Sequence, residues 1–195
     1  MIILGIDPGS ITTGYAFLEK KGIDLKVMEY GVLHAPADHA LEDRLLHIVS
    51  KLEDLLDKYR PEALSMEGVF FAKNARSALV LGHIRGAILV ACRKRGMTYN
   101  EYPPKVVKQA VTGDGGAAKE QVANMVFARL GITGGDLPLD ASDALAIAWT
   151  HANPSPMATA ILNAGGKKKS LTSRKKKAST KQWMDLIEKM GGSIQ

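Results

Sequence analysis

The stretch Ile2-Ile3-Leu4-Gly5-Ile6-Asp7-Pro8-Gly9-Ser10 opens the chain with an apolar run that ends on a carboxylate and then turns. Aliphatic and β-branched residues closed by Pro-Gly are typical of a buried strand followed by a turn. A carboxylate at the end of such a strand is costly unless a positive partner meets it, and a divalent cation is one such partner. The alternative is that Asp7 only caps the turn through the backbone, and this stretch alone does not decide between the two interpretations.

Residues 1–153 have the pattern of one mixed α/β domain. Strand-like segments at 13–19 and 25–34 follow the first strand through short connections, which predicts an antiparallel meander. Apolar residues at three- and four-residue steps predict an amphipathic helix over 40–59. The apolar segment 63–67 should then return parallel to the first strand. The remaining pattern favours a helix at 74–95, a strand at 97–102, and helices at 105–111, 117–130 and 140–152. The predicted fold is a five-stranded mixed sheet flanked by helices.

The segment 74–95 is apolar on more than one face of its predicted helix. A helix of this kind has to be buried on two sides, and a sheet covers only one of them. The other side needs a second helix or a second subunit. The pattern alone leaves both open, and the segment becomes the candidate dimer interface with the homodimer that the family resemblance described below implies.

The net charge of +6 is concentrated at the C-terminal end. Residues 155–195 carry a net charge of +7, which leaves −1 for residues 1–154. A basic tail on a nearly neutral domain favours a polyanion as partner, nucleic acid first, although such a tail can also serve solubility alone. We expect a flexible Lys-rich linker at 154–180 and a short amphipathic helix within 181–195 that docks on another surface.

Three features predict a cytoplasmic protein. The single cysteine, Cys92, has no partner for an internal disulfide and fits a reducing compartment. The N-terminal residues lack the basic region and cleavage site of a signal peptide. The longest uninterrupted apolar run, 86–92, is too short to span a bilayer.

Three further acidic residues stand where they could meet Asp7. Glu67 closes the strand that we expect beside the first strand, and Asp140 and Asp143 share one face of the last helix. Carboxylates this close repel one another unless a cation lies between them, and a set made only of carboxylates suits Mg²⁺ or Mn²⁺ and not zinc. Each acid alone also has a structural explanation, as an N-cap, a partner of the helix dipole or an exposed strand end. The hypothesis of a metal site rests on the joint pattern.

Four segments of the chain, taken in order, resemble the RuvC family of bacterial Holliday-junction resolvases. They are Gly5-Ile6-Asp7-Pro8-Gly9-Ser10, Met66-Glu67-Gly68-Val69-Phe70, the run from Val107 through Lys119, and Asp140-Ala141-Ser142-Asp143-Ala144-Leu145-Ala146. The resemblance covers residues 1–153. It implies an RNase H-like fold, a homodimer, and Mg²⁺-dependent paired nicking of a four-way DNA junction in recombination and repair. It also implies a branch-migration complex of the RuvA/RuvB type as a further partner.

By motif position, the resemblance also implies roles for individual residues. The implied catalytic metal ligands, for two Mg²⁺ ions that Mn²⁺ could replace, are Asp7, Glu67, Asp140 and Asp143. Lys108 and Lys119 match lysines near the scissile phosphates, and Phe70 matches an aromatic residue that stacks on a base. The second aromatic residue, Phe71, leaves open which of the two stacks.

General chemistry extends the set of candidate DNA contacts. Lys119 could neutralise charge that develops on the phosphoryl oxygens. Because phosphates dominate the affinity for a duplex, the basic residues around the motifs are candidate positioning contacts, namely Lys73, Arg76, Lys105 and Lys108. A solvated helix start would also explain Lys73 and Arg76, and core packing would also explain Phe71.

Two other functions stay open at this point, and the chain length argues against a third. A related RNase H-like nuclease acting on RNA would use the same acids, because such sites contact phosphates and not bases. A junction-binding protein without catalysis would use the acids for structure. An actin-like ATPase or sugar kinase, whose opening strand is similar to residues 5–10, needs two such domains and a second phosphate loop, which 195 residues do not supply.

Overall fold

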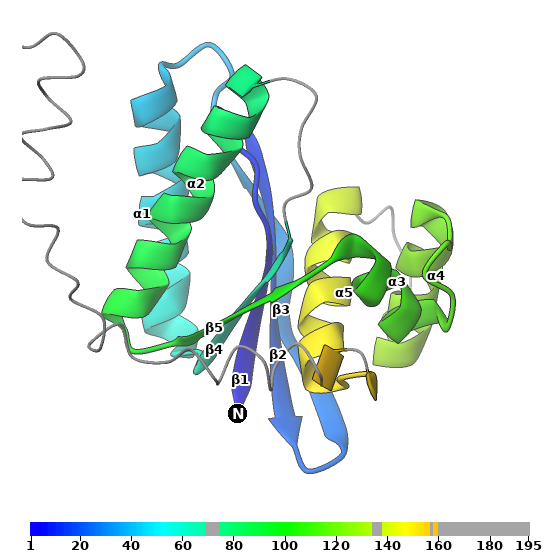
Figure 1. The fold of residues 1–195 in the computed structure, drawn as a ribbon. Coiled ribbons are helices and arrows are strands. Elements are labelled where there is room, and N and C mark those ends of the chain that lie inside the picture. Colours follow the sequence, from blue (N-terminus) through cyan, green and yellow to red (C-terminus); the bar gives the residue numbers. More distant parts are fainter. Residues whose placement is uncertain (69–74, 134–137, 157, 160–195) are drawn as a thin grey trace, which may run out of the picture. The chain divides into compact units, whose positions relative to one another are not determined.

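The computed structural model describes residues 1–68, 75–133, 138–156 and 158–159. Five strands form one mixed sheet (Figure 1): β1 (Ile2–Asp7), β2 (Thr12–Lys21), β3 (Asp24–His34), β4 (Ala63–Glu67) and β5 (Thr98–Tyr102). Their order is β3-β2-β1-β4-β5. β1 pairs antiparallel with β2 and parallel with β4, so that Ile6 lies opposite Met66. The antiparallel meander and the parallel return are therefore confirmed.

Helices cover both faces of the sheet (Figure 1). They are α1 (Leu41–Tyr59) and α2 (Ala75–Lys94) on one face, and α5 (Leu139–Ala152), with α3 (Pro104–Thr112) and α4 (Lys119–Leu130) outside it, on the other. Glycines in the left-handed conformation end two of the helices, Gly113 (φ 85°) after α3 and Gly131 (φ 65°) after α4. These are positions where a side chain would be strained.

Side chains alternate along β1, so neighbouring residues pack into two different cores, one on each face of the sheet. Leu4 and Ile6 belong to the core beneath α1 and α2, whereas Ile3 belongs to the core beneath α5. By the same alternation Asp7 points to the α5 side. On β4, Leu64 and Met66 belong to the α1/α2 core, which places Glu67 on the α5 side as well.

The helix α5 lies unusually close to the sheet. A Cβ atom added at Gly5 would stand 2.2 Å from the carbonyl oxygen of Ala144, and one added at Gly14 would stand 1.9 Å from that of Asp140. On the helix side, Ala141, Ala144 and Ala148 are fully buried. Glycines on two strands and alanines on the helix thus bring the backbones into contact.

The helix α2 is buried on one side only. Ile84, Ile88 and Cys92 are fully buried against the sheet and α1, whereas Leu79 and Val90 are 65% and 56% exposed. By length and composition alone this helix could cross a membrane, which is weak evidence because core helices meet the same criterion. The described residues supply no cover for its outer side.

Chain packing continues past the predicted domain end at 153. Ser155 Oγ accepts a hydrogen bond from the Ala158 N–H at 3.2 Å, and Ala158 is fully buried in the α5 core. The rest of the predicted linker and the whole terminal helix lie outside the described residues, as do Phe70, Phe71 and Lys73. The domain boundaries stay predictions.

The contact between α5 and β1 can be tested with Gly5→Ala. The added methyl group would collide with the backbone of Ala144, so we expect the free energy of unfolding to fall by about 3 kcal/mol or more. Urea denaturation followed by circular dichroism measures this change. The control is Gly116→Ala, whose methyl would meet only the Asp114 carboxylate at 3.4 Å and should change stability by less than about 0.5 kcal/mol. Equal stability of the two variants would contradict the proposed contact.

Candidate active site

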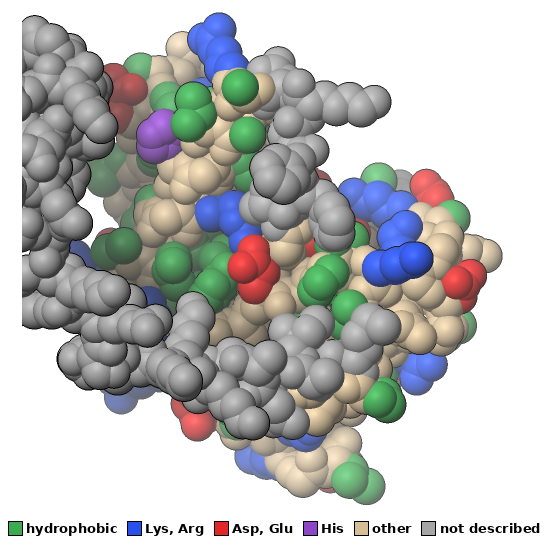
Figure 2. All heavy atoms as spheres, viewed as in Figure 1, with side chains coloured by type: hydrophobic (Ala, Val, Ile, Leu, Met, Phe, Trp, Pro, Cys, Tyr) green, Lys and Arg blue, Asp and Glu red, His purple; other side chains and the backbone are tan. Residues whose placement is uncertain are grey.

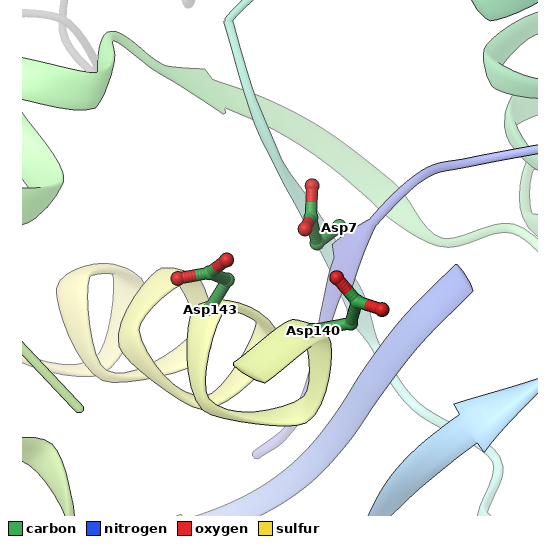
Figure 3. Close-up of side chains that lie close together, drawn as sticks. All are labelled: Asp7, Asp140 and Asp143. Carbon is green, nitrogen blue, oxygen red and sulfur yellow. The ribbon is translucent and has the colours of Figure 1, made fainter. Parts of the chain in front are cut away.

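Three carboxylates meet where β1 ends against the start of α5. Asp7, Asp140 and Asp143 each offer an oxygen within 4.8 Å of the others, and the three side chains lie close together (Figure 3). Asp7 is the last residue of β1 and faces α5 by the strand alternation. Because α5 begins at Leu139, the two helix acids lie in and just after its first turn on one face, where the helix dipole also favours negative charge.

Glu67 lies next to this group without belonging to it. It ends β4, which is paired with β1, but among the described residues only the three aspartates satisfy the 4.8 Å criterion. Its side chain lines a pocket of about 190 Å³ together with Lys108, Lys119 and Asp143. The apolar lining of this pocket consists of Pro104, Val107, Val122, Ala146 and Ile147. The structure thus brings the four predicted acids to one edge of the sheet, three of them in a tight group.

Burial and neighbouring carboxylates raise the pKa values of Asp7, Glu67 and Asp143. Burial raises the pKa of Asp7 to about 7, and the charges of Asp143, Glu67 and Asp140 add to this shift. Burial is also the main reason why the pKa values of Glu67 and Asp143 lie above their usual range. An ionised group in this place is unfavourable without a counter-charge, and a divalent cation bound by carboxylate oxygens would supply it. The residues present therefore fit a hard metal ion.

Lys119 supplies part of the missing positive charge. Its Nζ lies 2.5 Å from Asp143 Oδ2, and this ion pair raises the pKa of Lys119. The lysine is the first residue of α4 and is about half exposed, so its ammonium group reaches the site from the solvent side. It contacts the acid group directly, as a charge-neutralising residue must.

Of the other predicted basic contacts that the structure describes, Lys108 lines the pocket, whereas Lys105 and Arg76 do not. Lys108 donates to the Ala117 carbonyl at 2.7 Å and lines the pocket, and Lys105 is exposed on α3. Arg76 is exposed at the start of α2 and lines a separate hollow with Ser10, in the turn after β1. Lys and Arg side chains gather over α3 and α4 beside the site (Figure 2).

Arg85 is a neighbour of the site that the sequence analysis missed. Its guanidinium donates to the carbonyl oxygen of Glu67 at 2.7 Å and pairs with Glu101 at 2.6 Å. The available signal was a single cation in the middle of a strongly apolar helix segment, 78–92. A charge in such a place needs a polar partner nearby.

A family model described as "Crossover junction endodeoxyribonuclease RuvC" matches residues 3–151. The protein of that name from Ruminiclostridium cellulolyticum is 42% identical over 163 residues, which are 84% of this chain and 98% of that one. The protein of that name from Geobacter sulfurreducens is 44% identical over 165 residues, 83% of this chain and 98% of its own.

A similar solved structure is T. thermophilus RuvC in complex with a Holliday junction substrate. It superposes with a TM-score of 0.75 at 36% identity, over 82% of this chain and 97% of that one. The sheet order and flanking helices of the present chain are those of the RNase H-like fold, as predicted.

The crowding of acids predicts that Asp7→Asn stabilises the metal-free protein above neutral pH. The native pKa of about 7 lies above the ordinary value of 3.8, so ionised Asp7 costs stability. That cost is fully present above about pH 7, shrinks as the pH falls and is absent below about pH 4. The gain at about pH 8 should be on the order of 4 kcal/mol.

Urea unfolding in EDTA between about pH 4 and pH 8 measures this difference. Asp38→Asn is the control, because it makes the same substitution at an exposed turn outside the acid group. A variant no more stable than the wild type at about pH 8 would contradict the electrostatic description of the site.

Proposed function

Because the chain belongs to the RuvC family of crossover junction endodeoxyribonucleases, we propose that it resolves four-way DNA junctions by metal-dependent hydrolysis of phosphodiester bonds. The observation that carries this proposal is the group of three aspartates within 4.8 Å, with Glu67 and Lys119 beside it. A group of half-buried acids without a cation is destabilising, and such a cost is typical of a functional site. Hydrolysis of a phosphodiester is the reaction that this set of groups supports best.

The proposed ligands of the metal are the four acids at the edge of the sheet. Asp7 ends β1, which pairs with the strand that carries Glu67 and faces the helix that carries Asp140 and Asp143, so it would be the ligand shared by two ions. Asp140 and Asp143 on α5 and Glu67 on β4 complete the donor set. Oxygen-only ligands favour Mg²⁺, with Mn²⁺ as a substitute. Ions bound there would activate a water for in-line attack and stabilise the leaving oxygen.

Lys119 acts on the substrate phosphate in this proposal. In the absence of substrate it neutralises Asp143, and its partial exposure leaves the ammonium group able to reach an incoming anion. When a scissile phosphate is bound, Lys119 donates to a non-bridging oxygen and stabilises the charge that develops there. Lys108, which lines the same pocket, would contact the DNA backbone next to that phosphate.

Binding of the junction uses basic and aromatic residues around the site. Lys105 and Lys108 lie on α3 and Arg76 lies on α2, and all three would contact phosphates, which fix the register of the duplex. Lys73, Phe70 and Phe71 lie outside the described residues, and their roles stay predictions. A base held by either aromatic side chain would contribute about 1–3 kcal/mol.

The outer side of α2 is the proposed dimer face. Leu79, Gly82, Gly86 and Val90 follow one stripe of the helix, and all are exposed in the single chain. Hydrophobic side chains are visible along α2 (Figure 2). A two-fold dimer would pack this stripe on itself, and the glycines would let the two helices approach closely. A two-fold enzyme would match the symmetry of a junction that is nicked in pairs.

Two further assignments complete the proposal. A branch-migration complex is the proposed protein partner, because a resolvase acts on junctions that such a motor moves. The bacterial cytoplasm is the proposed location, supported by the single buried Cys92, whose thiol has no partner for a disulfide within the chain.

Cleavage of a labelled four-way DNA junction tests the proposed reaction. With Mg²⁺ the protein should make paired symmetric nicks, and EDTA should abolish them. Asp7→Asn should lower the rate by at least about a hundredfold and still bind the junction, since it removes a metal ligand and not a DNA contact. Tight junction binding with no cleavage under any divalent metal would contradict the proposal, and so would preferred cleavage of RNA hybrids.

Val90→Glu tests the dimer face. A charge at this position occurs twice in a two-fold interface, so the dissociation constant of the dimer should rise about tenfold or more. Sedimentation velocity over a concentration series measures it. Ile23→Glu is the matched control, because Ile23 is 95% exposed in the turn between β2 and β3 and should leave the dimer unchanged. A Val90→Glu protein that dimerises like the wild type would exclude this face.

A further inference from the structure

The peptide group that joins Glu67 to Gly68 is held on both of its polar sides. The Glu67 carbonyl accepts a hydrogen bond from Arg85 Nη1 at 2.7 Å. The Gly68 N–H donates to the Tyr102 carbonyl at 2.8 Å. The end of β4 is therefore fixed by β5 on one side and by a side chain of α2 on the other. This peptide directly follows the Cα atom that carries the Glu67 side chain.

Placing Arg85 at its position costs hydration of its charged guanidinium group. Its side chain is only 12% exposed, and its guanidinium has five N–H donors to satisfy. It reaches Glu101 at 2.6 Å and Tyr99 at 3.4 Å besides the Glu67 carbonyl. An apolar side chain of similar volume would pack there without the loss of hydration, and buried ion pairs contribute little to stability on average. Stability alone therefore gives a poor account of this arginine.

The position of the arginine explains it better. Arg85 extends from α2 to the strand end whose last side chain lines the pocket with Asp143 and Lys119. If this strand end were not held, it could shift and carry the Cα atom of Glu67 with it, and the Glu67 side chain, which lies outside the tight aspartate group, would move away from the site. Mutation of a polar group that orients a metal ligand typically lowers metal affinity or activity about 10–100-fold, and we expect an effect of this size here.

We propose that Arg85 is a positioning residue, which holds the Glu67–Gly68 peptide and thereby keeps the Glu67 carboxylate in the direction that metal binding and cleavage require. The inference rests on the proposed function, because it assigns Glu67 as a ligand. It concerns a residue of the proposed dimer helix, so it also links that helix to the active site.

The test compares Arg85→Met, which keeps the apolar stem and removes all donors, with Arg85→Lys, which keeps a charge and a donor. Arg93→Met is the matched control, because Arg93 is also on α2 and also donates to a backbone carbonyl, that of Met97, at the far end of the helix from Glu67. Three quantities are measured: the affinity for Mn²⁺ by calorimetry without DNA, junction affinity in EDTA, and the rate of junction cleavage against Mg²⁺ concentration.

We expect Arg85→Met to weaken Mn²⁺ binding or slow cleavage by about 10–100-fold while junction affinity in EDTA stays unchanged. Arg85→Lys should recover part of the loss, and Arg93→Met should match the wild type in all three measurements. Sedimentation of Arg85→Met should give the wild-type dimer, which separates the effect from assembly.

Two results would overturn the inference. One is an Arg85→Met protein with wild-type Mn²⁺ affinity and cleavage. The other is an equal loss in Arg85→Met and Arg93→Met that follows an equal drop in melting temperature, which would make the effect one of stability. If the wild type binds Mn²⁺ but cuts no junction, the proposed function fails, and the calorimetric comparison still decides the role of Arg85.

Discussion

The contact on which the site depends is the backbone approach of α5 to β1 and β2. Two glycines on the strands and buried alanines on the helix remove the side chains that would keep these elements at ordinary distance. Helix and sheet can then place an acid from each in one small volume. Without this approach Asp7 would stand too far from Asp140 and Asp143 for a single ion to contact all three. The same residues therefore serve both packing and chemistry.

Bringing the acids together lowers the stability of the fold through electrostatic repulsion and loss of hydration. Burial and mutual repulsion raise the pKa values of Asp7, Glu67 and Asp143, and the ion pair with Lys119 offsets only part of the repulsion. The surrounding core over-determines the geometry, since β1 is fully buried from Ile3 to Ile6. Stability gained in that core holds the carboxylates in an arrangement that they would not adopt by themselves.

Sequence patterns predicted the elements and the edge of the sheet at which the acids meet, because strand alternation and helix spacing are local properties. They did not predict that Glu67 stays outside the tight aspartate group, which depends on the distance between paired strands and the helix. Sequence patterns also did not predict the hydrogen bond from Arg85 to the Glu67 carbonyl, because it joins a side chain and a backbone atom 18 positions apart. The extension of packing to Ala158 depends in the same way on tertiary contact.

The two faces of the sheet have different roles in the proposed function. Alternation along β1 and β4 sends Leu4, Ile6, Leu64 and Met66 to the side of α1 and α2, and sends Asp7 and Glu67 to the side of α5. The proposed active site thus lies on the α5 face, whereas the apolar stripe proposed for assembly lies on the outer side of α2. Arg85 is a side chain from α2 that contacts the backbone of an acid-bearing strand at its end. A shift of α2 on assembly would therefore move the end of β4, and with it Glu67, through this hydrogen bond. The aspartate group is held by α5 and β1, so the same shift would displace it only through movement of the sheet.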